Sequence, residues 1–369
     1  MKILFIDEDE TSVTDGMALL RETACECLRV DFDALDLTLP TYRPDIIVLD
    51  MMNGGSAIDP TGKGGKISFD KIWQSKFCPI VVYSANPDLI DDISTDKSKN
   101  PLVRKVQKGK NSDEKLRDEI TKLKPCVDGI NGIINEVDNA LQVTLKKVAI
   151  HIVSQDGIDE ITTAIHYMGR RRLAAQMDDS SLLRPKLHPC EQYIYPPLAD
   201  YPKLGDVLRD TKADPKLSDT YRVVLTPSCD LVNQGTQSPR VKEVLCARCE
   251  NPEVLFSKAQ IERKIKILAK ALSQGYIKHY LPIPEFQGII PAMVANLKRL
   301  ELIPFDSIRN EEGEGVKFVR VASVDSPFRE QIAWAYMNIG SRPGVPDRDC
   351  DLWAKQYLGD SSNKGEKKS

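Results

Sequence analysis

The chain has 369 residues, of which 41% are hydrophobic and 28% are charged, and its formal net charge is −3. This near-neutral balance excludes a globally basic surface for nucleic acid, although it is compatible with a local basic patch. The length is sufficient for two domains and a helical connector.

Two further features of the composition concern the compartment. No apolar run approaches the ~20 residues that a membrane-spanning helix needs. The nine cysteines are scattered and odd in number, and several lie inside apolar runs, which is typical of buried thiols in a reducing compartment. We therefore expect a cytoplasmic protein without a membrane segment.

Two apolar stretches run directly into carboxylates. The chain opens with Met-Lys-Ile-Leu-Phe-Ile, a buried type of strand that is followed by Asp7 and Glu8. A run of Ile-Ile-Val-Leu, preceded by a turn-forming Arg-Pro-Asp, ends at Asp50 in the same way. Ligands of open α/β sheets bind at the carboxyl ends of the strands. Carboxylates gathered there repel each other and need a cation, and hard oxygen ligands of this kind suit Mg²⁺.

Between these two stretches, the apolar spacing over residues 14–30 predicts a helix, and residues 30–37 are predicted to return as a second strand. After Asp50, a glycine-rich segment over residues 53–66 is predicted to be a flexible loop, because it contains no Gly-x-x-x-x-Gly-Lys-Ser/Thr phosphate-binding motif.

Two later strands bring a hydroxyl and an ammonium group to equivalent positions. The strand over residues 78–85 delivers Ser84, and the strand over residues 102–109 delivers Lys108. This set of residues, in this order, resembles the receiver domain of two-component response regulators over roughly residues 1–125. The resemblance implies a doubly wound, parallel five-stranded sheet of the receiver or flavodoxin-like type.

The resemblance also implies a role for each side chain. Asp50 would be the phosphoacceptor, Ser84 the switch hydroxyl, and Lys108 the lysine that holds the phosphoryl oxygens. The implied partner is a histidine kinase or a phosphotransfer protein, and the implied cofactor is Mg²⁺. The implied metal ligands are the side chains of Asp7, Glu8 and Asp50 and the backbone carbonyl of Met52.

The sequence departs from the family at three positions. Asn53 and Gly109 stand where the family usually has proline, and Lys105 stands where its aromatic switch residue is expected. These departures leave the acceptor chemistry intact but remove the side chain on which the usual switching depends. They favour, as an alternative, a docking domain that works without phosphorylation.

A helical connector is predicted over residues 126–185. The helix that begins at Ser112, a cap-type residue, is predicted to end before Pro125. Over residues 126–153, apolar residues then recur at spacings of three and four, which predicts one apolar stripe along a helix. This stripe packs either on another helix of the same chain or on its copy in a homodimer.

Residues 186–350 are rich in short strands separated by proline, which predicts an α+β domain with a small β-barrel. A segment near residues 205–228 weakly resembles the barrel of small toxin ribonucleases of the MazF type, which supports a barrel rather than an activity. Residues 351–369 are predicted to be a partly disordered tail.

The cysteines of this second half suggest three alternatives. Cys246 and Cys249 have the C-x-x-C spacing of zinc ligands, to be completed by Cys229 and by His188 or Cys190. Cys229 is alternatively a nucleophile, because an acid follows it directly. The alternative that we favour is a structural turn with buried thiols, since Cys246 falls inside an apolar strand.

The sequence therefore predicts a phosphorylation switch of the response-regulator type, in which Asp50 controls an output domain of unassigned chemistry. The competing prediction is an effector enzyme that is gated by the receiver and acts on RNA or another substrate. No nucleic-acid-binding module is indicated by the sequence.

Overall fold

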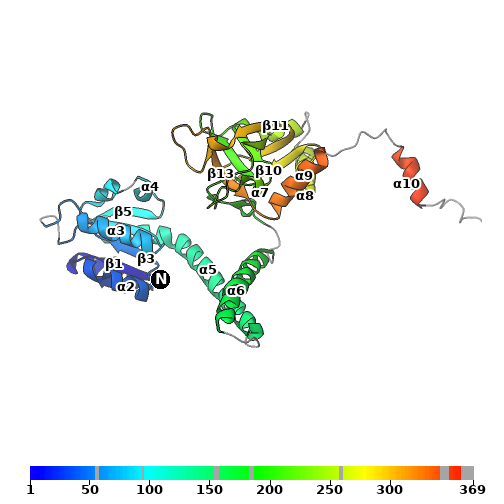
Figure 1. Ribbon diagram of the computed structural model, residues 1–369. Helices are drawn as coiled ribbons and strands as arrows, with labels where there is room; N and C mark the ends of the chain where they lie inside the picture. Colours follow the sequence, from blue (N-terminus) through cyan, green and yellow to red (C-terminus); the bar gives the residue numbers. More distant parts are fainter. Residues whose placement is uncertain are drawn as a thin grey trace, which may run out of the picture. The chain divides into compact units, whose positions relative to one another are not determined.

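The computed structural model describes residues 1–54, 58–93, 95–152, 158–182, 187–256, 261–340 and 349–358. The chain divides into two compact units, residues 1–183 and 184–369 (Figure 1). None of the helices in the described ranges is long and apolar enough to cross a membrane.

The first unit is built on a parallel five-stranded sheet with the strand order β2-β1-β3-β4-β5. This is the order of flavodoxin-like doubly wound folds, so the predicted fold class is confirmed. Every residue of β3 and β4 is buried, as expected for strands that helices cover on both faces. The strands are β1 (Lys2–Ile6), β2 (Glu26–Val30), β3 (Ile46–Leu49), β4 (Ile80–Ser84) and β5 (Val103–Gln107).

Two hydrophobic cores lie on opposite faces of this sheet. Neighbouring residues of β1 alternate between them, Leu4 in one core and Phe5 in the other, because side chains of a strand point to opposite faces in turn. One core includes residues of α2 and α3, and the other includes residues of α1 and α5. The helices are α1 (Thr11–Arg21), α2 (Leu35–Tyr42), α3 (Lys63–Ser75), α4 (Thr95–Ser98) and α5 (Ser112–Ile152).

The second strand was predicted too late in the chain. It spans Glu26–Val30 and pairs in register with β1, whereas residues 32–42 form a 3₁₀ turn and α2. Phe32, Leu35 and Leu39 are all buried, and their spacing of three and four places them on one face of a helix. The apolar residues after position 30 therefore fit a helix and not a strand.

Helix α5 continues without a break through Pro125, so the prediction that it ends before this residue is wrong. A proline inside a helix removes one backbone hydrogen bond, here the bond to the carbonyl of Thr121. Leu123 and Val127 on either side are buried in the same core, and this burial offsets the loss. With 41 residues the helix is about 60 Å long.

Helix α6 (Ile158–Leu182) packs along the second half of α5. Ala140, Thr144 and Val148 are buried, and the Thr144 hydroxyl lies 3.4 Å from Oε1 of Gln176 in α6. The predicted stripe is therefore only partly covered within the chain. Four of its residues stay between 37 and 43% exposed: Ile134, Val137, Leu141 and Leu145.

The second unit is organised around a mostly antiparallel eight-stranded sheet with the order β10-β11-β9-β8-β7-β13-β12, to which β6 adds by pairing with β13. Among the described strands, β10 and β12 lie at the two edges of the sheet and do not pair with each other. The predicted barrel is therefore an open sheet here, which bends at bulges in β11 and β13. The strands are β6 (Tyr193–Ile194), β7 (Asp206–Asp210), β8 (Tyr221–Val224), β9 (Glu243–Glu250), β10 (Tyr280–Ile283), β11 (Met293–Pro304), β12 (Ile308–Arg309) and β13 (Phe318–Val324).

This sheet also separates two cores. Val207 lies in one core and its neighbour Leu208 in the other. The larger core includes Ile332 of α9, and the smaller one includes Leu231 of α7. The helices are α7 (Ser228–Leu231), α8 (Ile261–Gln274), α9 (Phe328–Gly340) and α10 (Cys350–Leu358).

Candidate functional site

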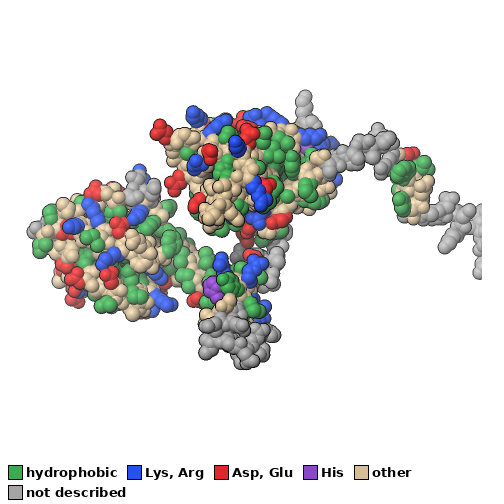
Figure 2. Space-filling view, viewed as in Figure 1, with side chains coloured by type: hydrophobic (Ala, Val, Ile, Leu, Met, Phe, Trp, Pro, Cys, Tyr) green, Lys and Arg blue, Asp and Glu red, His purple; other side chains and the backbone are tan. Residues whose placement is uncertain are grey.

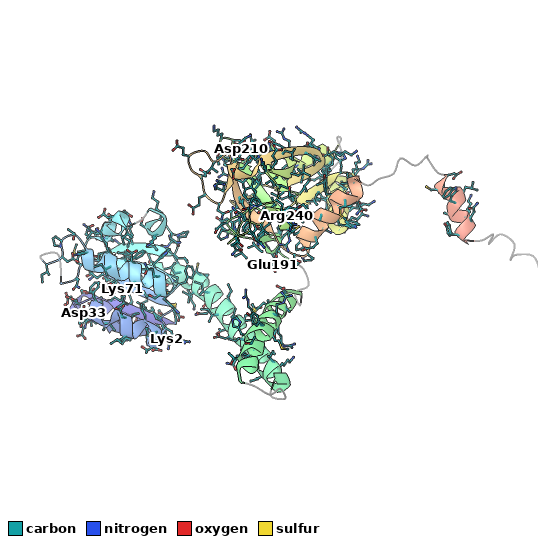
Figure 3. All side chains as sticks on the ribbon, viewed as in Figure 1. Lys2, Asp33, Lys71, Glu191, Asp210 and Arg240 are labelled. Atoms are coloured by element: carbon teal, nitrogen blue, oxygen red, sulfur yellow. The ribbon has the colours of Figure 1, made fainter. Side chains whose placement is uncertain are left out.

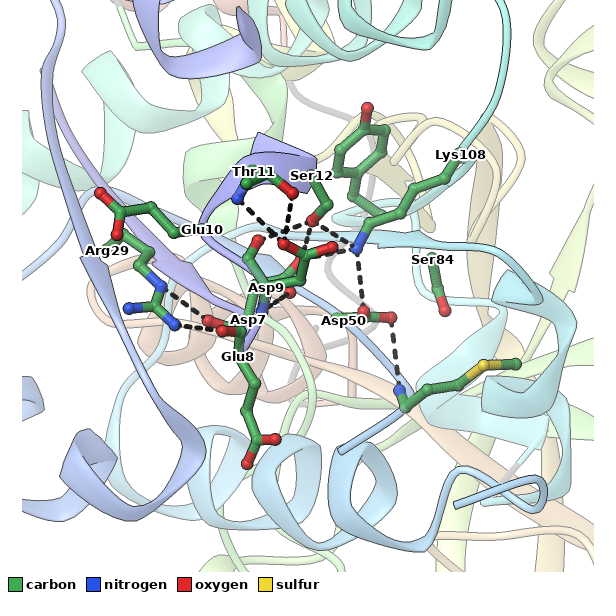
Figure 4. A network of polar contacts seen from close by, with 12 residues as sticks. Asp7, Glu8, Asp9, Glu10, Thr11, Ser12, Arg29, Asp50, Ser84 and Lys108 are labelled. Atoms are coloured by element: carbon green, nitrogen blue, oxygen red, sulfur yellow. Dashed lines mark hydrogen bonds and ion pairs between the residues drawn. The ribbon is translucent and has the colours of Figure 1, made fainter. Parts of the chain in front are cut away.

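Four strands of the first unit end at one edge of the sheet, and each end carries one of the predicted site residues (Figure 4). Asp7 follows β1, Asp50 follows β3, Ser84 ends β4, and Lys108 follows β5. The sheet ladder holds two of these positions directly. The backbone N–H of Asp50 donates to the carbonyl of Ile6 at 2.9 Å, and that of Lys108 donates to the carbonyl of Ser84 at 2.9 Å.

The centre of the site is the ammonium group of Lys108. Its Nζ donates to Oδ2 of Asp7 at 2.5 Å, to Oδ2 of Asp50 at 2.9 Å and to Oγ of Ser12 at 3.0 Å. The side chains of Lys108, Asp7 and Asp50 are only 17, 4 and 11% exposed. Burial alone would lower the pKa of Lys108, but the charge of Asp50 and the hydrogen bonds to both carboxylates outweigh it, so the pKa is raised.

Ser12 and Tyr83 belong to this network and were not predicted. The hydroxyl of Ser12 donates to Oδ2 of Asp7 at 3.0 Å. The Tyr83 ring lies 5.5 Å from Nζ of Lys108, and its hydroxyl is 2.7 Å from that of Ser112. The sequence signal for Ser12 is its place in the first turn of α1, five residues after Asp7. Tyr83 directly precedes Ser84 but gives no comparable signal, because only the fold brings it beside Lys108.

Glu8 does not join the two aspartates. Glu8 is exposed, and in Figure 4 its side chain points away from Asp50. Arg29 holds this segment through the backbone, because it donates to the carbonyl of Asp7 at 2.8 Å and to that of Glu8 at 2.6 Å. In the part of the chain that the structure describes, no group of three or more acidic, histidine or cysteine side chains is placed to hold a metal.

The pair of Asp7 and Asp50 nevertheless fits the needs of a magnesium ion. Mg²⁺ usually takes one or two carboxylates from a protein and completes its shell with waters and phosphate oxygens. Both aspartates form an ion pair with the ammonium group of Lys108, so their carboxylates point toward one position. Two negative charges directed at one position favour the binding of a cation there. A metal bound there would take two carboxylates from this edge without Glu8.

The segment after Asp50 is shaped by close backbone packing. The N–H of Met52 donates to Oδ1 of Asp50 at 3.3 Å. A Cβ on Gly65 would lie 2.4 Å from Cα of Met51, so only glycine fits where α3 crosses this segment. Asp59 accepts from the N–H groups of residues 63 and 64 and fixes the start of α3. The predicted flexible loop is therefore shorter than expected, because α3 begins at Lys63, and residues 55–57 lie outside the described residues.

Ser84 and Lys105 flank the site on the side of β4 and β5. Ser84 is fully buried, its Oγ accepts from the N–H of Asn86 at 3.4 Å, and Figure 4 shows it beside Asp50 and Lys108. Lys105 instead reaches the surface, where it pairs with Asp88 at 3.1 Å and Asp91 at 2.6 Å. The position of the expected aromatic residue is thus occupied by an ion-pair network that ties β5 to the segment after β4.

In the described part of the second unit, Cys246 and Cys249 do not converge on a common site. Cys246 lies in the smaller core and Cys249 in the larger one, because residues three apart on a strand point to opposite faces. Burial raises the pKa of both thiols, that of Cys249 to about 12. Cys229 is exposed, with its sulfur 3.8 Å from Asp230. The buried positions of Cys246 and Cys249 agree with structural thiols, whereas Cys229 is exposed and not buried as expected.

Comparison with known proteins yields structural matches alone. No protein-family model and no curated protein matches the sequence. The chain is similar to the BeF₃-activated N-terminal receiver domain of Klebsiella pneumoniae RstA, at 18% identity and a TM-score of 0.27, covering 32% of this chain and 97% of that chain.

Two further solved structures are similar to the same extent. One is the signal receiver domain of a putative Luxo repressor protein from Vibrio parahaemolyticus, at 14% identity and a TM-score of 0.29, covering 36% of this chain and 95% of that chain. The other is the N-terminal domain of a response regulator/sensory box/GGDEF 3-domain protein from Carboxydothermus hydrogenoformans, at 15% identity and a TM-score of 0.27, covering 36% of this chain and 99% of that chain.

Proposed function

We propose that the first unit is a phosphorylation switch in which Asp50 accepts a phosphoryl group from the phosphohistidine of a histidine kinase or phosphotransfer protein. The observation that carries this proposal is the bridge that Lys108 forms between Asp7 and Asp50 at the carboxyl edge of a parallel sheet. A buried lysine that bridges two carboxylates beside a hydroxyl is well arranged to receive a phosphoryl group, whose three terminal oxygens share a negative charge.

In the transfer step, a carboxylate oxygen of Asp50 forms a bond to phosphorus while the bond between phosphorus and the donor imidazole nitrogen breaks. The imidazole keeps that electron pair and takes a proton from solvent. The ammonium group of Lys108, which donates hydrogen bonds to the two carboxylates, can then donate to the phosphoryl oxygens instead. The Ser84 hydroxyl lies on the same side of Asp50 as Lys108 (Figure 4). The contribution of both side chains is positioning and electrostatic stabilisation.

Asp7 and Asp50 would hold the magnesium ion, with the backbone carbonyl of Met52 as the ligand that the family resemblance implies. When bound, the ion neutralises the charge that develops on the phosphoryl oxygens. Glu8 would contribute only after its side chain turns inward from the surface, so we assign it a secondary role. We place this chemistry in the cytoplasm, where thiols such as those of this chain stay reduced.

The phosphorylation signal would pass to the second unit through the connector helices, since α5 leaves the core of the first unit and continues to Ile152. Phosphorylation would bias the packing of this helix and of the stripe along it. The buried triad of Lys108, Asp7 and Asp50 disfavours the alternative of a docking domain without phosphoryl chemistry. The chemistry of the output unit is not assigned.

The test is phosphorylation of the full chain by acetyl phosphate with and without Mg²⁺, read by the mass of the intact protein and of the peptide that carries Asp50. We expect one phosphoryl group per chain that requires Mg²⁺ and is lost in Asp50→Ala. Asp9→Ala is the matched control, because Asp9 lies at the same edge but its carboxylate accepts from Thr11 and not from Lys108. Wild-type protein that stays unmodified, or a label that persists in Asp50→Ala, would refute the proposal.

A further inference from the structure

The second unit carries an apolar groove that the proposed phosphorylation chemistry does not use. Its volume is about 460 Å³, within the range of ligand-binding pockets. Its floor is formed by β10 and the start of β11, one wall by α8, and the other by the start of α9 and the turn at residues 187–192. Most of its lining is apolar, and His188, Gln192 and Gln331 supply polar atoms.

The α8 wall exposes hydrophobic side chains along its length. Ile261, Ile265, Leu268 and Leu272 recur at spacings of four, three and four, so they lie on one face of this helix. Leu268 and Leu272 line the groove, while Ile261, Ile265 and Leu272 are 75, 62 and 55% exposed. A row of this kind at the mouth of an apolar groove matches the surfaces that bind an amphipathic helix.

The walls of the groove are held in place by specific contacts. Gly275 directly follows the end of α8 and has a positive φ of 81°, and a Cβ there would lie 2.4 Å from the Gln331 side chain, so α8 and α9 meet closely. On the opposite rim, the N–H of His188 donates to the carboxylate of Glu191, which is labelled in Figure 3, at 2.9 Å. The groove is therefore a built feature of this unit.

Helix α10 has the properties of a segment that fits such a groove. It has nine residues, fewer than the ~12–15 that an isolated helix needs for stability in water. Leu352, Trp353 and Tyr357 are 54, 47 and 89% exposed, and the two aromatic residues lie one turn apart on the same face. Figure 2 shows hydrophobic side chains on the surface of this helix. The helix gains stability once this face is buried.

The connection between α9 and α10 is long enough for this contact. Nine peptide steps separate Gly340 from Asp349, and they span at most about 30 Å. The groove is lined by Phe328, Gln331 and Ile332 at the beginning of α9, and the whole helix of 13 residues is about 20 Å long. A segment that starts after the end of α9 can therefore reach back to the groove of its own chain.

We propose that the groove between α8 and α9 is a binding site for an amphipathic helix with aromatic anchors, and that its occupant is α10 of the same chain. Trp353 would fill the apolar interior, and its indole N–H would meet one of the polar atoms at the rim. Docked α10 would close the groove to other partners. This inference does not depend on phosphorylation of Asp50.

Hydrogen exchange of α8 and β10 in the full chain tests this proposal. If the affinity of the separate helix is of the order of 100 μM and its local concentration of the order of 1 mM, α10 is docked about nine-tenths of the time. The double variant Trp353→Glu, Tyr357→Glu should therefore speed exchange in α8 about tenfold. Leu272→Glu in the groove should have the same effect, and combining both changes should add little more.

The controls separate docking from general damage. Lys355→Ala changes α10 outside its aromatic face, and Leu302→Glu places a charge at another exposed apolar position, 57% exposed on β11; both should leave exchange in α8 unchanged. Equal exchange in wild type and the α10 double variant would overturn the proposal. Protection of α8 that rises with protein concentration in the Val137→Lys, Leu141→Lys variant, whose α5 stripe is charged, would also overturn it, in favour of a second copy as the occupant.

Discussion

The replacement of Lys108 by methionine tests the electrostatic centre of the site directly. Methionine keeps the length and apolar body of the side chain but leaves Asp7 and Asp50 without their common donor. Because all three side chains are nearly buried, the two carboxylates would face each other with little solvent between them. The variant should therefore be less stable at neutral pH, and added Mg²⁺ should restore part of the loss.

The expected magnitude follows from burial. Removal of one partner from a buried ion pair costs about 3–5 kcal/mol, and each hydrogen bond to a charged group contributes about 1.5–3 kcal/mol. We expect the first unit of Lys108→Met to lose about 3–5 kcal/mol of unfolding free energy. Lys105→Met is a matched control, because Lys105 also pairs with two aspartates, but its partners are 77 and 53% exposed. That change should cost less than about 1 kcal/mol.

The pH dependence of the wild type should have a defined sign. Since the pKa of Lys108 is raised above its usual value of 10.5 by the two carboxylates, the folded state binds this proton more tightly than the unfolded state. The stabilisation is therefore fully present below pH 10.5 and is lost as the pH rises through the folded-state pKa. Lys108→Met should lack this alkaline loss.

The assay is urea unfolding of the full chain, followed by hydrogen exchange in peptides from β1 and β3, which report on the first unit alone. Equal destabilisation by Lys108→Met and Lys105→Met would contradict the assignment of Lys108 as the buried centre. A Lys108→Met protein that gains no stability from Mg²⁺ would contradict the proposed metal position.

Two further changes probe the surroundings of the site and the connector. Gly65→Ala places a methyl group against the backbone of Met51, so we expect it to lower the free energy of unfolding by about 1–3 kcal/mol and to slow phosphorylation of Asp50. Gly132→Ala is the control, because a Cβ at Gly132 of α5 meets open space and should not destabilise the protein. Equal stability of both variants in urea unfolding would refute the packing argument. We also expect the chain to dimerise through the exposed stripe of α5. The double variant Val137→Lys, Leu141→Lys should then be a folded monomer in light scattering, because it places two charges in the dimer interface. A wild type that is monomeric with and without phosphorylation would exclude dimerisation through this stripe.

Much of the first unit was predictable because its signals are local. Strands buried on both faces are continuous apolar runs, and each of these runs ends at a polar residue whose chemistry is visible in the sequence. The sequence therefore predicts that Asp7, Asp50, Ser84 and Lys108 lie at one edge of the sheet. The parallel order of the sheet followed from the alternation of strands and helices.

The connector shows where local signals mislead. Pro125 predicts the end of a helix, yet α5 continues, because Leu123 and Val127 are buried in one core. The stripe of residues 126–153 was visible in the sequence, but which part of it α6 covers depends on contacts between two helices. Residues 30–37 were assigned to a strand from a short apolar run, and their burial at helical spacing decided otherwise.

The geometry of the site required the tertiary structure. The sequence by itself determined which residues reach the edge of the sheet, since that depends on where each strand ends. It did not determine that Glu8 points outward while Ser12 turns in, because contacts of Arg29 hold the backbone at Glu8 and the first turn of α1 positions Ser12. It also did not reveal that Lys105 pairs with Asp88 and Asp91, which are 17 and 14 residues away in the chain. Strand ends follow from hydrophobicity along the chain, whereas side-chain partners depend on packing between elements that are distant in sequence.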